Sequence, residues 1–157
     1  MKKTRTLAEK AISSLLAPHG FAKNGSVWTL ELPGSVLGVQ LQGSRFAAGR
    51  AYLNFLAWYP ALSAQPHSGF RSDFHLSFRG DDAHAEAIQA ALTFDGSETE
   101  LHAYASQLDT LFFAASLQRL LRLSTLDAAI AAVRADTMRG YSLALWNAAY
   151  PDAAAIP

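Results

Sequence analysis

Asp73-Phe74-His75-Leu76-Ser77-Phe78-Arg79 alternates polar and apolar residues without a single exception. Successive side chains of a β-strand point to opposite faces of the sheet, so the pattern predicts a strand with Phe74, Leu76 and Phe78 on one face. That face would pack on a core. The other face would present an acid, an imidazole, a hydroxyl and a guanidinium in a row, and we expect any functional site to lie there.

Three earlier segments show the same period of two and predict further strands: Ser26–Leu32, Val36–Gln42 and Arg50–Tyr59. Asn24-Gly25 is a tight-turn signal that joins a short extended stretch, Phe21–Lys23, to the first of them. A second turn signal, Pro33-Gly34, leads into the next strand. Turns this short between neighbouring strands indicate an antiparallel meander.

Apolar residues at helical spacing predict helices before and after these strands. Thr6 with Glu9 three residues later resembles a capping box for the first helix, and Ser97 with Glu100 resembles another. The predicted helices run over Thr6–Ala17, over Asp81–Ala91, from Ser97 onward, over Thr125–Ala135 and over Tyr141–Ala149. Leu92-Thr93-Phe94 fits a further strand equally well.

Together these elements predict one α+β domain over residues 1–151. We expect an antiparallel sheet of four to five strands, packed on one face by the N-terminal helix and the C-terminal helices. Residues 152–157 have the character of a frayed tail.

The composition narrows the classes of function. Thirteen basic residues balance thirteen acidic ones, which argues against a general nucleic-acid or anionic-membrane binder, because such proteins depend on clustered positive charge. The absence of cysteine removes disulfides, thiolate catalysis and cysteine-ligated metal sites. No apolar run approaches the ~18 residues of a membrane span, and Glu9 and Lys10 interrupt the apolar stretch that a signal peptide needs. We therefore expect a cytoplasmic protein.

The polar face of the predicted sheet also carries aromatic residues. Six of its residues form our candidate binding surface: Arg50, Tyr52, Asn54, Trp58, His75 and Arg79. Trp58 and Tyr52 are costly to expose to water, and aromatic and arginine anchors inside a polar rim are typical of protein interfaces. The pattern favours a non-enzymatic binding module that takes a protein partner or a second copy of the chain. A plain solvated sheet surface explains the same pattern.

Asp73, His75 and Ser77 are the three residue types of a hydrolase triad. Residues two apart on a strand lie about 6.5–7 Å apart with parallel side chains, whereas a proton relay needs about 2.6–3.2 Å. We therefore assign no catalytic residue. A small hydrolase with His75 as base beside Asp73 stays an alternative, on condition that a second polar segment meets His75. The histidines are scattered without metal-binding spacing, so we expect no metal and no cofactor.

The order of the elements resembles that of a known family. A leading helix runs into Pro18-His19-Gly20-Phe21-Ala22-Lys23-Asn24-Gly25-Ser26-Val27-Trp28, and strands containing Gln40-Leu41-Gln42 and Leu53-Asn54-Phe55 follow. Over most of its length the chain resembles a bacterial domain-of-unknown-function family, number 4304. This resemblance implies no known activity, so no site residue is carried over from it. The small α+β form also resembles, more loosely, immunity proteins that neutralise bacterial toxins, which makes a toxin-immunity role a further alternative.

Overall fold

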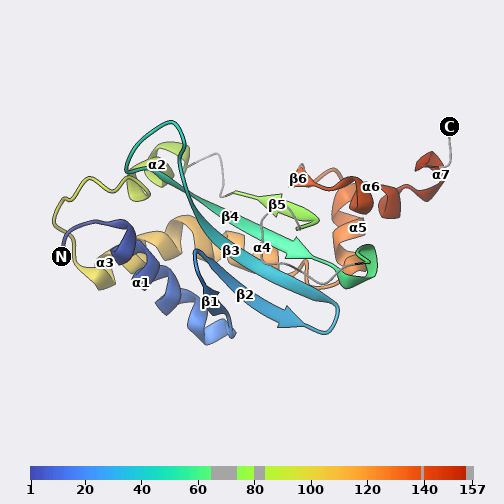
Figure 1. Cartoon of the computed structure of the whole chain (residues 1–157), viewed down its shortest axis with the longest axis horizontal. Helices are drawn as coiled ribbons and strands as arrows, with labels where there is room; N and C mark the ends of the chain where they lie inside the picture. Colours follow the sequence, from blue (N-terminus) through green and yellow to red (C-terminus); the bar gives the residue numbers. More distant parts are fainter. Residues whose placement is uncertain (65–73, 80–83, 139, 155–157) are drawn as a thin grey trace.

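The computed structural model describes residues 1–64, 74–79, 84–138 and 140–154 of the chain. Within them an antiparallel sheet of six strands is built in the order β1-β2-β3-β4-β5-β6, so that every strand pairs with the next one along the chain (Figure 1). The strands are β1 (Ala22–Asn24), β2 (Val27–Leu32), β3 (Ser35–Gly43), β4 (Ala51–Trp58), β5 (Leu76–Phe78) and β6 (Gly140–Tyr141). The predicted α+β class and the meander are confirmed, with six strands in place of four to five.

Two-residue turns link the first three strands. Asn24 pairs with Val27, so the first turn consists of Gly25 and Ser26 and lies one residue later than predicted. Gly25 has a φ of 63°, in the left-handed region that glycine enters without steric cost. The second turn lies at Pro33-Gly34, as predicted.

Helices precede and follow the strands. They are α1 (Arg5–Leu16), α2 (Ala85–Ala91), α3 (Leu101–Leu108), the π-helical segment η5 (Asp109–Leu117), α4 (Gln118–Leu121), α5 (Leu126–Arg134), α6 (Leu143–Ala149), α7 (Pro151–Ala154) and two short 3-10 helices, Ala17–His19 and Pro60–Leu62. α7 occupies the start of the predicted frayed tail. Across the described ranges, none of the helices has the length and apolar character that crossing a membrane requires.

Side-chain caps start α1 and α3 at residues other than those predicted. Thr4, two residues before the predicted cap, accepts a hydrogen bond from the backbone N–H of Leu7 at 3.3 Å. The carboxylate of Glu100 accepts hydrogen bonds from the backbone N–H groups of His102 and Ala103, each at 2.8 Å. These two bonds hold the pKa of Glu100 below its usual value. Both predicted capping boxes are therefore wrong, and Glu100 itself is the second cap.

One face of the sheet and the helices enclose the main core (Figure 1). Its strand residues are those that the alternation placed inward: Trp28, Leu37, Val39, Leu41, Ala51, Leu53, Phe55, Ala57 and Leu76. Residues of α1, α3, α4, α5 and α6 belong to the same core, which confirms that the N-terminal and C-terminal helices cover one face. Tyr104 of α3 lies among them and donates a hydrogen bond to the carbonyl of Ala91 at 2.9 Å, and burial raises the pKa of Tyr104 to about 12.

The segment Asp73–Arg79 forms a shorter strand than predicted. β5 covers only its Leu76–Phe78 portion, and the chain bends immediately before it. Leu76 belongs to the main core, whereas Phe74 lies in a second apolar cluster on the opposite face of the sheet. The prediction that Phe74 and Leu76 share a face is therefore wrong, because the bend interrupts the strict alternation of a strand. Asp73 lies outside the described residues.

Candidate functional site

The second face of the sheet divides into two parts, which we call the apolar half and the polar half. The apolar half consists of Val36, Leu56, Trp58 and Phe74 together with His75. The polar half consists of Gln40, Gln42, Tyr52, Asn54 and Arg79. The predicted binding residues are thus split between the two halves, and Arg50 directly precedes β4 at the polar end.

The apolar half is a closed cluster. The ring of Phe74 lies over Gly38, where an added Cβ would come within 3.1 Å of it. Trp58 is only 8% exposed, and its ring stacks on the imidazole of His75 with 6.2 Å between ring centroids. The expectation that Trp58 is an exposed anchor is therefore wrong, because apolar and aromatic side chains of this half pack against it.

His75 makes a structural hydrogen bond through one of its two ring nitrogens. It is 7% exposed, and its Nδ1 accepts a hydrogen bond from the backbone N–H of Tyr59 at 2.9 Å. An accepting Nδ1 carries no proton, so the ring hydrogen sits on Nε2. The bond satisfies a backbone donor that would otherwise be buried without a partner. The hydrolase alternative gains no support from this arrangement, and its second residue, Asp73, is not among the described ones.

The polar half is held together by the amide of Asn54, which is only 1% exposed. The register of β3 and β4 places Asn54 opposite Gln40 and Tyr52 opposite Gln42. Asn54 Nδ2 donates to Gln42 Oε1 at 2.9 Å and to Gln40 Oε1 at 3.3 Å. Asn54 Oδ1 accepts a hydrogen bond from Arg79 Nε at 3.1 Å. Both donors and the acceptor of the buried amide are therefore used.

Arg79 is exposed, yet its guanidinium is fixed from two sides. Nε donates to Asn54, and the guanidinium carbon lies 4.2 Å from the centroid of the Tyr52 ring, in a cation–π contact. Among the described residues, the Nη groups of Arg79 have no hydrogen-bond or ion-pair partner. The polar half therefore presents a cation that Asn54 and Tyr52 hold in a defined orientation.

A cavity of about 230 Å³ adjoins the polar half. β5 pairs only with Phe55–Ala57, so within the described chain it does not extend along the first half of β4, which the cavity borders. The cavity is lined by Arg50, Ala51, Tyr52, Leu53, Arg79, Ala85, Ile88, Gln89, Leu92 and Phe112. Phe112 comes from the π-helical segment η5, and π-helical turns are rare and often found at functional sites.

Arg50 enters this cavity from the end of the sheet. Its backbone is held by a bridge to Thr93, and the next N–H, that of Ala51, donates to the carbonyl of Leu92 at 2.9 Å. Arg50 Nε is buried and has no hydrogen-bond partner among the described residues. Buried polar groups are nearly always hydrogen-bonded in folded proteins, so an unpaired one needs an explanation.

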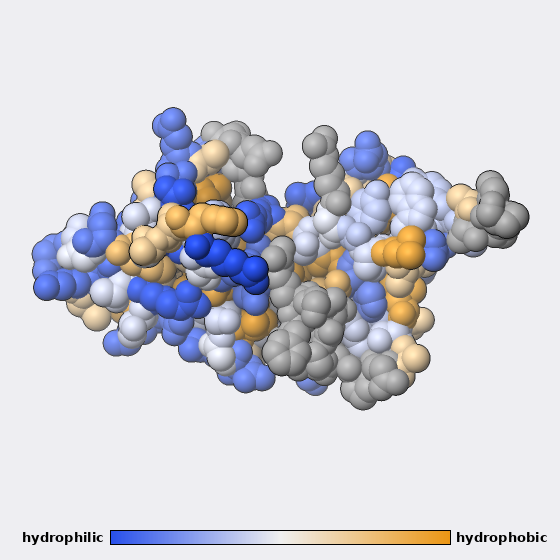
Figure 2. All heavy atoms as spheres, turned by 45° about the horizontal axis from the view of Figure 1, so that its top comes forward, coloured by the Kyte–Doolittle hydropathy of each residue, from blue (hydrophilic) through white to orange (hydrophobic). Residues whose placement is uncertain are grey.

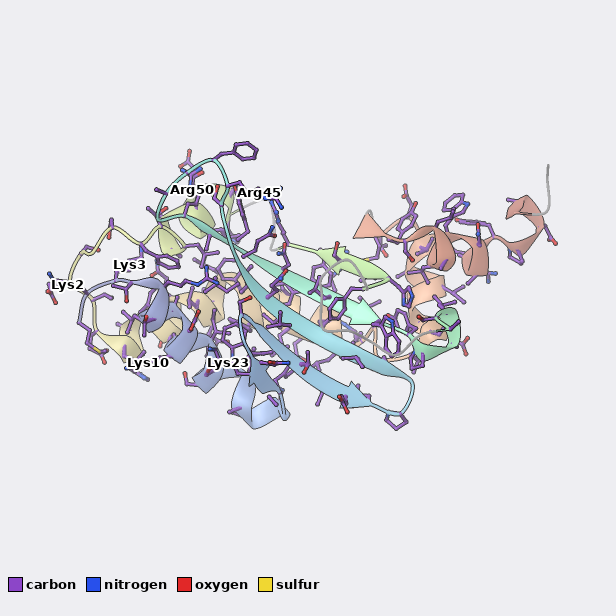
Figure 3. The ribbon with its side chains drawn as sticks, viewed as in Figure 1. Lys2, Lys3, Lys10, Lys23, Arg45 and Arg50 are labelled. Carbon is purple, nitrogen blue, oxygen red and sulfur yellow. The ribbon has the colours of Figure 1, made fainter. Side chains whose placement is uncertain are left out.

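Basic residues are concentrated in the first third of the chain, although acidic residues such as Glu98 lie at the same end of the molecule. The first 50 residues hold seven basic residues against two acidic ones. Figure 3 shows six of the basic side chains in the half that contains the N-terminus, with Arg45 and Arg50 at the two sides of the turn between β3 and β4. In the space-filling view of Figure 2, hydrophilic side chains cover much of the same half.

Sequence reasoning found part of this site. The alternation in β4 and after β5 correctly placed Tyr52, Asn54 and Arg79 on one face. It missed Ile88, Gln89 and Phe112, because helical periodicity does not say where a helix docks on a sheet. Within the described chain, no group of three or more histidine, aspartate or glutamate side chains is placed to hold a metal ion.

Comparison with known proteins gives a family and no activity. A family model described as "Domain of unknown function (DUF4304)" matches residues 12–111 of the 157. The match begins within α1, contains β1 to β5 and α2, and ends within η5. No curated protein and no solved structure matches the chain significantly.

Proposed function

The chain belongs to the DUF4304 family, whose function is unknown, and we propose that it is a non-enzymatic binding module with its binding site on the polar half of the second sheet face. The observation that carries the proposal is the state of Arg79. Its guanidinium is oriented by Asn54 and Tyr52, while its outer donors have no partner in the described residues.

Preorganisation is what makes this arrangement suited to binding. Ordering a long, flexible side chain on binding costs about 0.5–1.5 kcal/mol, and this cost is avoided where the free protein already holds the side chain in place. Asn54 lies in β4 within a rigid sheet, so the guanidinium that it holds is positioned by the fold itself. A ligand that pairs with Arg79 therefore meets a fixed donor geometry.

The burial of Trp58 favours a small ligand over a large partner at this face. A stable protein–protein interface buries about 800 Å² on each side and relies on central aromatic anchors. Trp58, the aromatic anchor that the sequence offered, is buried within the protein. A protein partner or a homodimer through this face stays a prediction, as does the cytoplasmic location. No observation on the described residues favours the hydrolase or the toxin-immunity alternative.

A fragment screen by NMR tests the proposal. The ¹⁵N-labelled full chain is titrated with a fixed library of small acidic, basic and neutral compounds. We expect the compounds that bind to shift the signals of Tyr52, Asn54 and Arg79, and the Arg79→Gln variant to lose these shifts. The Arg122→Gln variant removes an exposed arginine from the end of α4 and serves as the matched control that keeps them.

Two results would overturn the proposal. One is a set of binding compounds whose shifts gather away from the polar half, for example around Tyr141 and Trp146. The other is a set of shifts at the polar half that the Arg79→Gln variant retains unchanged.

A further inference from the structure

The cavity beside the polar half contains hydrogen-bond donors that have no acceptors among the described residues. They are Arg50 Nε, which is buried, and the Nη groups of Arg79. A guanidinium carries five N–H donors and no acceptor, so each of these groups requires an acceptor from another group. Leaving a buried charged donor unpaired costs more than leaving a neutral one, so a ligand that pairs with Arg50 gains this energy.

The backbone adds a further donor at the same edge. The N–H of Ala51 donates to Leu92 and the carbonyl of Ala57 accepts from His75, so the odd-numbered residues of β4 turn their backbone groups toward the side of β5. Leu53 lies between these two residues, lines the cavity and falls outside the stretch that β5 pairs with. Its N–H therefore lies along the edge that borders the cavity.

The charge of the cavity selects the class of ligand. Two arginines line it, and no aspartate or glutamate is among the described residues that do so. Arginine is the preferred partner of carboxylate and phosphate groups, because its planar fork matches two of their oxygens at once. The cavity is therefore complementary to an oxyanion.

The remaining lining limits the size and character of the ligand. Ile88, Leu92 and Phe112 contribute apolar side chains to the lining of the cavity. Its volume of about 230 Å³ lies below the ~300–1,000 Å³ of most ligand pockets. Such a space holds an acid group and a compact apolar body rather than a nucleotide.

We propose that this cavity binds a small organic oxyanion, a carboxylate or a phosphate monoester, whose acid group pairs with Arg50 and Arg79 and whose apolar body packs on Ile88 and Phe112. This inference rests on the proposed function and deepens it by naming the class of ligand. It also explains why Arg50 keeps a buried, unpaired Nε.

Four probes test the proposal by calorimetric and NMR titration of the full chain at low salt. They are phenyl phosphate, benzoate, phenol and inorganic phosphate. We expect phenyl phosphate or benzoate to bind and to shift the signals of Leu53 and of the Arg50 side chain. Whichever of these two probes binds more tightly identifies the acid group that the cavity prefers. A hydrogen bond to a charged group contributes about 1.5–3 kcal/mol, so the neutral phenol is expected to bind at least about tenfold more weakly.

Variants locate the binding energy. Arg50→Gln and Arg79→Gln are each expected to weaken the better probe by about tenfold or more, for the same reason. Arg50→Lys keeps the charge but loses the two-pronged geometry, and is expected to fall between wild type and Arg50→Gln. Arg45→Gln removes an exposed arginine from the turn between β3 and β4 that also contains Arg50. It is the matched control, and we expect no change in the affinity for the probe. If Arg50→Gln fails to fold, the test rests on Arg50→Lys, which keeps the charge: weaker binding of the probe by this variant would support the role of Arg50, and unchanged binding would contradict it.

Each contrary outcome has its own meaning. Equal binding of phenol and phenyl phosphate at this cavity would overturn the oxyanion class while leaving the binding module intact. If inorganic phosphate bound as tightly as phenyl phosphate, the proposal that an apolar body of the ligand packs on Ile88 and Phe112 would be overturned. No shift at Leu53 or Arg50 with any probe would overturn the inference, and fragment hits at Asn54 and Tyr52 would then still support the proposed function.

Discussion

The apolar and polar halves of the second sheet face lie on the same two strands and differ in what completes them. Phe74 closes the apolar half over Gly38, so Trp58 and His75 are buried there. In the polar half, the hydrogen bonds among the described residues end at the guanidinium of Arg79. Strand alternation decides which face a side chain points to, but a covering residue decides whether that face is a core or a surface. The two halves should therefore respond differently to mutation, the first in stability and the second in binding.

The largest effect is expected from Phe74→Ala. Removing a buried phenylalanine side chain leaves a cavity and costs about 3–5 kcal/mol of unfolding free energy. Urea denaturation followed by circular dichroism measures the loss. Phe46→Ala is the control, because Phe46 is 97% exposed and should contribute almost nothing. Equal stabilities of the two variants would show that the apolar half is not a core.

His75→Ala tests whether the imidazole supports the backbone. The variant leaves the buried N–H of Tyr59 without an acceptor, which costs about 1–3 kcal/mol. His75→Asn offers an oxygen near the position of Nδ1 and is expected to recover part of the loss. Denaturation gives the energy, and amide hydrogen exchange at Tyr59 shows whether the acceptor is responsible. A His75→Ala variant as stable as the exposed-site control His102→Ala would contradict this role.

Asn54→Leu tests two effects of the buried amide at once, its contribution to stability and its orientation of Arg79. It removes three hydrogen bonds but keeps a side chain of similar size, so we expect a loss of about 1 kcal/mol, because the freed glutamine groups are only half-buried and can turn to water. The signal of Arg79 Nε should also lose the shift that a fixed hydrogen bond gives. An unchanged Arg79 signal would mean that Tyr52 alone orients the guanidinium.

Arg79→Gln should have the smallest effect on stability. Its side chain is exposed, and Nε2 of the introduced glutamine stands where Arg79 Nε stood and can still donate to Asn54 Oδ1, so we expect a loss of less than about 1 kcal/mol of unfolding free energy. The same variant is expected to lose binding, so the polar half would separate function from stability. A loss of stability as large as that of His75→Ala would erase the distinction between the halves.

Much of the fold could be predicted from local patterns. Turn residues and strict alternation specify β2, β3 and β4 almost to the residue, because each pattern acts between neighbours in the chain. No turn residue or break in the alternation marks the bend before Leu76. Because of this bend, Phe74 lies on the face opposite the one predicted. β6 contains only Gly140 and Tyr141, too few residues to show any period.

The candidate site was predictable only where it follows strand alternation. Tyr52, Asn54 and Arg79 were placed together because every second residue of a strand points to the same face of the sheet. The cavity depends on β5 being shorter than β4 and on α2 and η5 docking beside the gap. These are relations between distant segments, and a single sequence records no distance between them. The buried state of Trp58 and His75 was missed for the same reason.

The close approach of β6 to β5 has a consequence for comparing related chains. A Cβ at Gly140 would clash with the carbonyl oxygen of Ser77, so β5 and β6 would have to move apart to admit a side chain there. The family match ends at residue 111, before this strand. A related chain with a side chain at the position equivalent to 140 is therefore expected to space these last two strands differently.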